Sequence, residues 1–313
     1  MKKTAAALLI AIVISAVPVF TSCSDKSENE SGLKIVCSIF PQYDFCRIIT
    51  GTEENLTLLQ KNGTDMHSYE PTSGDILEIA RCDILVYTGG QSDAWVDGVL
   101  RSAENDDIIT CSLFDYVDLL YERLPEYSEH GGDSHDHSGE VYDEHVWMSV
   151  TNAVKIVRGL TEIICQADPE NKDKYTANSE KYIESLNALD KDFRKLCENP
   201  RTIIVGDRFP FLYFTEEYGI DYYAAFPGCS AETEASFETV TFLINKAKEL
   251  QAEYIFQTDD SNQAVAQKIA EDTGARVLSL YSCQSITDEQ FDNGESYLSL
   301  MRKNLQTLTE AWS

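Results

Sequence analysis

Basic side chains are scarce in this chain. Its 313 residues include 25 Lys and Arg against 53 Asp and Glu, and the formal net charge at pH 7 is −28. A phosphate backbone would repel such a chain, so we exclude nucleic acid as a partner. An acidic surface attracts cations, which favours a protein that handles metal ions, although many acidic surfaces are only solvated faces.

The short motifs of common catalytic sites are also missing. The chain has no HExxH, GxSxG, GxxxxGKS, GxxxxGKT or GxGxxG segment, and no two cysteines are spaced as CxxC. An exported zinc hydrolase is the alternative to a binding protein, and it needs a general base beside an open metal position. Asp259, Asp260 and Glu144 are the acids available for that role, but no motif supports it. We therefore expect no enzyme.

The first 22 residues are typical of a secretory signal peptide. Two lysines precede an almost continuous apolar stretch over residues 4–20, and Cys23 follows at the cleavage point. A polar run then extends to residue 32, as in a bacterial lipobox. We expect an exported protein that is lipidated on Cys23 and tethered by residues 23–32 to the bacterial cell membrane, on its extracytoplasmic or periplasmic face. An ordinary signal peptide with a chance cysteine is the alternative.

Strand-like apolar runs alternate with helical patterns over residues 33–120 and again over residues 200–313. This alternation is typical of βαβ units and a mostly parallel sheet. We therefore predict an α/β fold with two lobes, residues 33–150 and 200–313, each with a mostly parallel sheet flanked by helices.

A long helical pattern separates the predicted lobes. Within the linking helices, residues 151–199, large apolar side chains recur every seven residues from Tyr175 to Leu196. A helix from Pro169 to about residue 198 would be about 45 Å long. We predict a rigid strut that joins the two lobes; a long surface helix is the alternative.

Residues 121–144 interrupt the alternation with a polar, acidic run that predicts an exposed loop. This loop contains three of the five histidines, namely His130, His135 and His137. The other two, His67 and His145, fall in loops beside predicted strands and helices, where open α/β sheets bind ligands. Imidazole binds zinc, and it binds manganese or iron together with carboxylates, although a lone histidine is often only structural.

The surroundings of these two histidines resemble a known family. The matching segments are Ile39-Phe40-Pro41-Gln42-Tyr43-Asp44, Asp65-Met66-His67-Ser68-Tyr69-Glu70-Pro71, Asp75, Gly89-Gly90, Trp95 and Glu144-His145-Val146-Trp147-Met148. Together they resemble the metal-binding lipoproteins of ABC importers for zinc and manganese, over the whole mature chain. The resemblance implies that His67 and His145 are metal ligands and that the partners are a divalent cation and a membrane permease.

The resemblance implies a third ligand, His or Glu, at a position that here holds Arg208. Arginine stays protonated and cannot bind a metal. Asp207 is the natural substitute, and capping of the helix predicted from Pro210 is its alternative role. The implied fourth ligand falls near Cys283, where no acid stands.

Several replacements for the fourth ligand remain open. They are Cys283, Asp259, Asp260 or a water molecule. Eight cysteines follow Cys23, an even number that an exported protein can pair in disulfides. A Cys229–Cys283 disulfide would remove the thiolate of Cys283 as a ligand.

We expect a receptor that captures Zn²⁺ with His67, His145 and Asp207 and delivers it to an ABC-type importer. The histidine-containing loop favours zinc, because the zinc members of the family carry such loops; a solvated linker is the alternative. Mn²⁺ and Fe²⁺ suit the same donor set and remain alternatives. An adhesin or interaction protein with a degenerate metal site is the alternative of another class.

Overall fold

Two four-stranded sheets, all of whose paired strands are parallel, organise the chain. The structure, a computed structural model, describes residues 32–61, 63–123, 141–230, 235–259 and 263–313. The first sheet has the order β2-β1-β3-β4. Its strands are β1 (Ile35–Cys37), β2 (Leu56–Leu58), β3 (Ile84–Tyr87) and β4 (Ile109–Ser112). The second has the order β6-β5-β7-β8. Its strands are β5 (Ile203–Phe209), β6 (Tyr222–Pro227), β7 (Tyr254–Thr258) and β8 (Arg276–Leu280). The predicted α/β class with two parallel sheets is confirmed.

The two central strands of the first sheet, β1 and β3, are buried on both faces, which explains their uninterrupted apolar runs. Side chains alternate along a strand. Val36 and Leu85 therefore pack on one face against α2 (Ser73–Ala80) and α3 (Val96–Ala103). Ile35, Cys37, Ile84 and Val86 join the main core on the other face.

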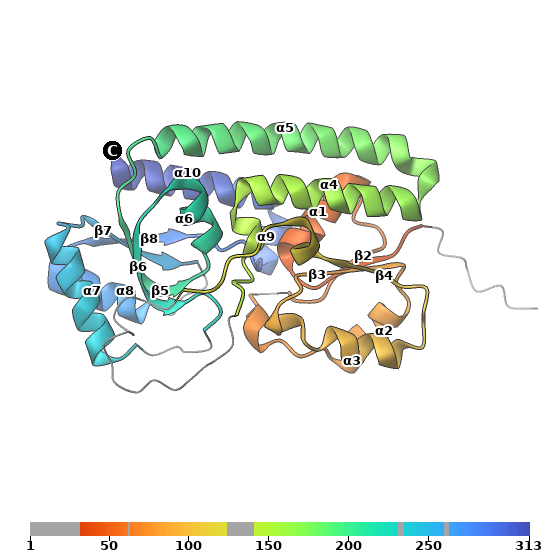
Figure 1. Cartoon of the computed structure of the whole chain (residues 1–313), viewed down its shortest axis with the longest axis horizontal. Coiled ribbons are helices and arrows are strands. Elements are labelled where there is room, and N and C mark those ends of the chain that lie inside the picture. Colours follow the sequence, from red (N-terminus) through yellow and green to blue (C-terminus); the bar gives the residue numbers. More distant parts are fainter. Residues whose placement is uncertain (1–31, 62, 124–140, 231–234, 260–262) are drawn as a thin grey trace, which may run out of the picture. The chain divides into compact units, whose positions relative to one another are not determined.

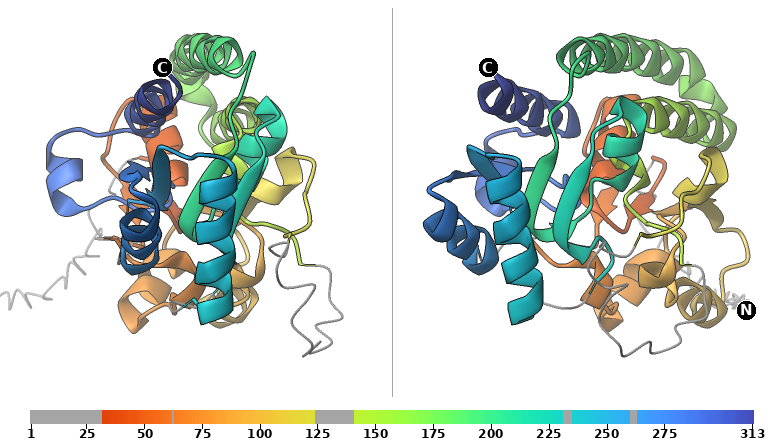
Figure 2. Two further views of the ribbon diagram at one scale, coloured as in Figure 1. Left: turned by 90° about the vertical axis from the view of Figure 1, so that its left-hand side faces the viewer. Right: turned by 60° about the vertical axis from the view of Figure 1, so that its left-hand side comes forward.

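The second sheet repeats this arrangement. Ile204 and Ile255 pack with α7 (Phe237–Glu249) and α8 (Ala264–Thr273), while Val205 faces the main core. Figures 1 and 2 show α7 and α8 on the outer side of this sheet. Each sheet is thus a layer between helices, and its carboxyl-terminal loops are free to carry ligands.

A layer of long helices covers the inner face of both sheets (Figure 1). It consists of α1 (Phe40–Thr50), α4 (Val150–Ala167), α5 (Lys172–Leu196) and α10 (Tyr297–Trp312). The 25 residues of α5 span about 38 Å, and this helix packs on the other three. The predicted long helix is confirmed, but a 3-10 turn over Pro169–Asn171 precedes it.

The remaining short elements position the loops. They are α6 (Leu212–Tyr218), α9 (Asp288–Asp292) and the 3-10 turns η1 (Met66–Ser68), η2 (Gln91–Asp93), η3 (Leu113–Tyr116) and η5 (Val146–Met148). Because α6 begins at Leu212 with Phe211 at its N-cap, Asp207 does not cap it. The capping alternative for Asp207 is therefore wrong, and the residue lies inside β5.

Residues 33–313 form one compact unit, so the predicted limits of the lobes and of the linking segment stay predictions. The signal peptide, Cys23 and residues 124–140 with their three histidines lie outside the described residues. Within the described part of the chain, no helix is long and apolar enough to cross a membrane. The eight cysteines there are all free, so the Cys229–Cys283 disulfide is not formed.

Candidate metal centre

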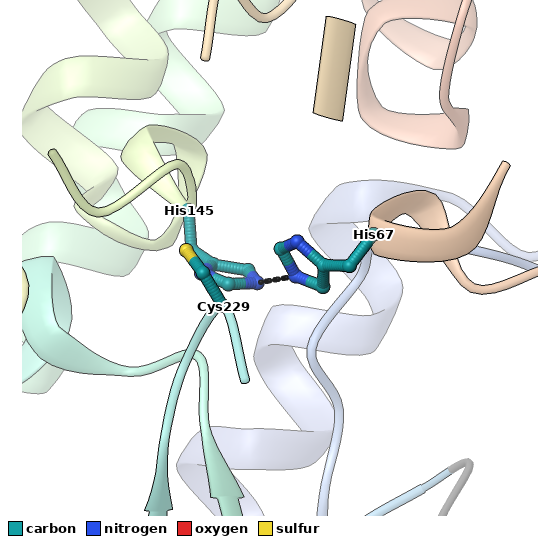
Figure 3. Close-up of side chains that lie close together, drawn as sticks. All are labelled: His67, His145 and Cys229. Carbon is teal, nitrogen blue, oxygen red and sulfur yellow. Dashed lines mark hydrogen bonds between the residues drawn. The ribbon is translucent and has the colours of Figure 1, made fainter. Parts of the chain in front are cut away.

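Two imidazole rings from distant parts of the chain face each other. His67 lies in η1, in the loop after β2, and His145 lies immediately before η5. Their Nε2 atoms are 3.3 Å apart although 78 residues separate them in sequence. Figure 3 shows the two rings approaching from opposite sides, each with Nε2 toward the other. The structure thus brings together the two histidines that the sequence singled out.

Each ring is fixed through its other nitrogen. Nδ1 of His145 lies 3.2 Å from Oδ1 of Asp143, which also accepts a 2.9 Å hydrogen bond from the His145 amide. Nδ1 of His67 lies 2.9 Å from the hydroxyl oxygen of Ser92. We assign the ring protons to these Nδ1 atoms, which leaves a lone pair on each Nε2. A carboxylate or hydroxyl behind a histidine is the usual support of a metal ligand.

Two facing lone pairs repel each other unless a cation lies between them. Two nitrogens bound to a tetrahedral zinc, each at about 2.05 Å, lie about 3.3 Å apart. The observed separation of the Nε2 atoms is the same. The imidazoles therefore already have the spacing that tetrahedral zinc requires.

Burial and charge set the protonation of the pair. Burial and the neighbouring His145 lower the pKa of His67 to about 3, so this ring is neutral and able to bind a metal at physiological pH. Burial opposes protonation of His145 as well, but the charges of Asp143, Glu144 and Glu122 outweigh it and raise the pKa of His145. The environment of His145 thus favours positive charge.

Acidic side chains surround the pair. The Glu144 Oε1 accepts a 3.0 Å hydrogen bond from the Ser92 amide, and Oε2 lies 3.7 Å from Nδ1 of His67. This Oε2 is buried and has no hydrogen-bond partner among the residues that the structure describes. A buried carboxylate oxygen without a hydrogen bond is costly, and a nearby cation offsets that cost. The surroundings therefore also favour a bound cation.

Cys229 is a third candidate ligand, which sequence reasoning did not assign to the site. Its Sγ and one ring nitrogen each from His67 and His145 lie within 4.8 Å of one another. The residue follows the carboxyl end of β6 in a turn that Gly228 begins. A Cβ at Gly228 would lie 2.8 Å from a backbone oxygen of Phe209. A cysteine in a tight turn after a strand of a parallel sheet was the available signal.

The structure does not place Asp207 with the histidines. Its Oδ2 accepts hydrogen bonds from the hydroxyl and the amide of Thr258, at 2.6 and 3.2 Å, and so ties β5 to β7. Its Oδ1 accepts from the Arg208 amide at 2.8 Å. Asp207 as a metal ligand stays a prediction, and this conformation uses its carboxylate elsewhere.

Arg208 reaches across from the second sheet to the loop of His67. Its Nη1 donates to Oδ2 of Asp65 over 2.6 Å, and Oδ1 of Asp65 accepts from the His67 amide over 3.0 Å. Arg208 is therefore not a ligand, but it holds the segment that carries one.

The other proposed fourth ligands lie apart from the three clustered side chains. Cys283 is fully buried and directs its Sγ to the carbonyl of Tyr281 at 3.8 Å. Asp259 Oδ1 accepts a 3.0 Å hydrogen bond from the Ser282 amide. Asp260 lies outside the described residues.

The two parallel sheets and the convergent imidazoles define a metal-binding solute-binding protein. The chain belongs to the family described as zinc-uptake complex component A, periplasmic (ZnuA), whose sequence model matches residues 35–311. The predicted resemblance to the metal-binding lipoproteins of ABC importers is thereby confirmed.

Two curated relatives illustrate the match. The zinc-binding lipoprotein AdcA of Streptococcus pneumoniae serotype 4 is 30% identical over 294 residues, which cover 92% of this chain and 58% of AdcA. This chain thus spans little more than half the length of that relative. The high-affinity zinc uptake system protein ZnuA of Bacillus subtilis is 28% identical over 314 residues, which cover 99% of this chain and 98% of that protein. The names of these two relatives describe zinc binding and zinc uptake.

Solved structures agree on the fold. The Zn(II)-bound ZnuA-like domain of AdcA from Streptococcus pneumoniae matches with a TM-score of 0.73 and 26% identity, covering 89% of this chain and 98% of the domain. The metal-dependent lipoprotein YcdH from Bacillus subtilis matches with a TM-score of 0.74 and 27% identity, and the match covers 90% of this chain and 99% of YcdH. The laminin-binding protein Lmb of Streptococcus agalactiae matches with a TM-score of 0.75 and 22% identity, covering 90% of this chain and 100% of Lmb. At this identity the match shows the fold alone.

Proposed function

We propose that this protein is an exported receptor that captures Zn²⁺ and delivers it to an ABC-type importer. The observation that carries the proposal is the pair of Nε2 atoms of His67 and His145, 3.3 Å apart and each supported from behind. Relatives named zinc-binding lipoprotein and zinc uptake protein support the same cargo. No catalytic role is proposed.

Zinc fits this pair better than the alternative cargo ions. Mn²⁺ prefers a larger coordination shell rich in oxygen, whereas a tetrahedral set of imidazoles is typical of zinc. We keep Mn²⁺ and Fe²⁺ as competitors to be measured. The adhesin alternative is not proposed, because the facing Nε2 atoms of His67 and His145 favour metal binding and the likeness to Lmb shows only the fold.

Export and anchoring belong to the same proposal. We infer that residues 1–22 are removed as a signal peptide and that Cys23 carries the lipid, with residues 23–32 as the tether. The name of AdcA as a lipoprotein supports an anchor at the outer face of the cell membrane.

Capture and release require only small movements of the two lobes, residues 33–150 and 200–313. The long α5 packs along α1, α4 and α10, and a stiff helix restricts hinge motion compared with a flexible linker. We propose that zinc holds the lobes together and that docking on the permease separates them.

The test is metal titration of metal-stripped residues 33–313. One tightly bound zinc, at 100 times its Kd, should stabilise the fold by about 2.7 kcal/mol. Both His67→Ala and His145→Ala should abolish this stabilisation, while Ser68→Ala, whose exposed side chain lies beside His67, should retain it. A parallel titration with Mn²⁺ measures the preference of the protein for zinc over manganese. Absence of any stabilisation by either ion would refute the proposal.

A further inference from the structure

We propose that the thiolate of Cys229 is the third zinc ligand, so that the cargo is held by two imidazoles and one sulfur. This inference rests on the proposed zinc capture and deepens it. It assigns a donor from the second lobe to a site whose histidines come from segments before α4.

The position of Cys229 supports the assignment. The Cys229 amide donates a 2.7 Å hydrogen bond to Oε1 of Glu122, which fixes the turn after β6 beside the site. Figure 3 shows Cys229 beside His145, opposite His67. A sulfur and a nitrogen on one tetrahedral zinc lie about 3.6 Å apart. The three donor atoms lie within 4.8 Å of one another, so a shift on the order of 1 Å completes this geometry.

The other candidates from the second lobe are engaged elsewhere. Asp207 accepts from Thr258, and Asp259 accepts from Ser282. Cys283 is buried against the Tyr281 carbonyl. Within the described ranges, Cys229 is the residue of the second lobe whose donor atom clusters with both imidazoles.

Coordination by Cys229 includes the loss of its thiol proton. A bound zinc displaces the thiol proton to solvent, since a coordinating sulfur is deprotonated outright. The thiolate in turn compensates one of the two charges of the ion.

A sulfur donor has a consequence for selectivity. Thiolate is a soft ligand that favours zinc and disfavours manganese, which prefers carboxylate and water. Replacement of Cys229 by a residue with an oxygen donor should therefore weaken zinc binding much more than manganese binding. The ratio of the two affinities is the quantity that the sulfur controls.

Cobalt substitution tests the ligand directly. Co²⁺ replaces zinc in the metal-stripped protein, and bonding to sulfur adds an intense thiolate-to-cobalt charge-transfer band in the near ultraviolet. We expect this band in the wild type and in Cys165→Ser, a matched change of a partly exposed thiol in α4. We expect its loss in Cys229→Ser, with zinc affinity reduced by more than about 100-fold, since even supporting residues are worth about 10- to 100-fold.

The outcomes separate this inference from the proposed function. Cobalt that binds the wild type without a sulfur band, or a Cys229→Ser protein with unchanged zinc affinity, overturns the assignment of Cys229 while zinc capture by the histidines stands. Failure of the wild type to bind any metal overturns the proposed function itself. Because the band is measured on the intact wild type, the test holds even where a variant folds poorly. Loss of zinc binding in Asp207→Ala together with an absent sulfur band would instead assign the third position to Asp207.

Discussion

We expect Asp143 to control the zinc affinity of the proposed ligand His145 without touching the metal. Its side chain is buried, and Oδ1 lies 3.2 Å from Nδ1 and 2.9 Å from the amide nitrogen of His145. This carboxylate fixes the ring orientation and makes Nε2 more basic, as supporting carboxylates do in zinc proteins. Loss of such a residue typically lowers metal affinity about 10- to 100-fold, or about 1.4–2.7 kcal/mol.

Two substitutions separate charge from geometry. Asp143→Ala removes the acceptor and its charge, and we expect the full loss of about 10- to 100-fold in zinc affinity. Asp143→Asn keeps an acceptor oxygen without the charge. Because charge-assisted hydrogen bonds are roughly twice as strong as neutral ones, we expect a loss of about 3- to 10-fold for this variant.

The assay is competition between the protein and a chromogenic zinc chelator at constant pH and ionic strength. Asp118→Ala is the matched control, because it removes one acidic side chain that is fully exposed and lies on the surface. The control should bind zinc as the wild type does. An Asp143→Ala protein that binds zinc as tightly as this control would refute the reasoning. Circular dichroism of each metal-free variant shows whether the fold is retained.

Two further predictions concern the loops that carry the site. The ion pair of Arg208 and Asp65 should contribute about 1–2 kcal/mol to the stability of the metal-free protein, because both side chains are mostly buried and the bond is charge-assisted. A double-mutant cycle with Arg208→Ala and Asp65→Ala, measured by urea unfolding, should show this coupling, and additive effects would contradict it. Burial alone would raise the pKa of Asp65. The hydrogen bonds from Arg208 and from the His67 amide, together with the charge of Arg208, outweigh burial and lower this pKa. The coupling should therefore be present above about pH 4 and disappear as the pH falls through that lowered pKa. The Cβ of Gly228→Ala would lie 2.8 Å from a backbone oxygen and 2.9 Å from the carboxylate of Asp143, so zinc affinity should fall at least about tenfold. Gly98→Ala is the control, because Gly98 lies in a helix and its new Cβ would meet open space. This variant should leave zinc binding unchanged and raise the free energy of unfolding by about 0.5–1 kcal/mol. Equal zinc affinities of Gly228→Ala and Gly98→Ala would refute the role given to the turn at Gly228.

Local patterns determined much of this fold. Apolar runs that alternate with helical periodicity predicted two parallel sheets, because strand and helix periods are properties of neighbouring residues. The repeat from Tyr175 to Leu196 predicted the long α5. Its first three members, Tyr175, Tyr182 and Leu189, are buried, and Leu196 is partly buried. The segments around His67 and His145 predicted ligands, because each motif lies within a few consecutive residues.

The role of Asp207 was beyond this kind of reasoning. Its sequence context suited both a metal ligand, which was our prediction, and a cap of the helix predicted from Pro210. In the structure β5 continues to Phe209 and α6 begins only at Leu212. The carboxylate therefore meets Thr258 of the adjacent strand, a contact that depends on the pairing of β5 with β7.

The sequence by itself determined the elements, the two histidines and the acidic character of the protein. Only the tertiary structure decided which donors meet. It sets the Nε2 atoms 3.3 Å apart, brings Arg208 to Asp65 across 143 residues, and places Cys229 beside both imidazoles. The physical reason is that β6 is the edge strand beside β5, so the turn after it lies over the carboxyl end of the sheet. That order of strands is a result of long-range packing, and the spacing of residues along the chain does not encode it.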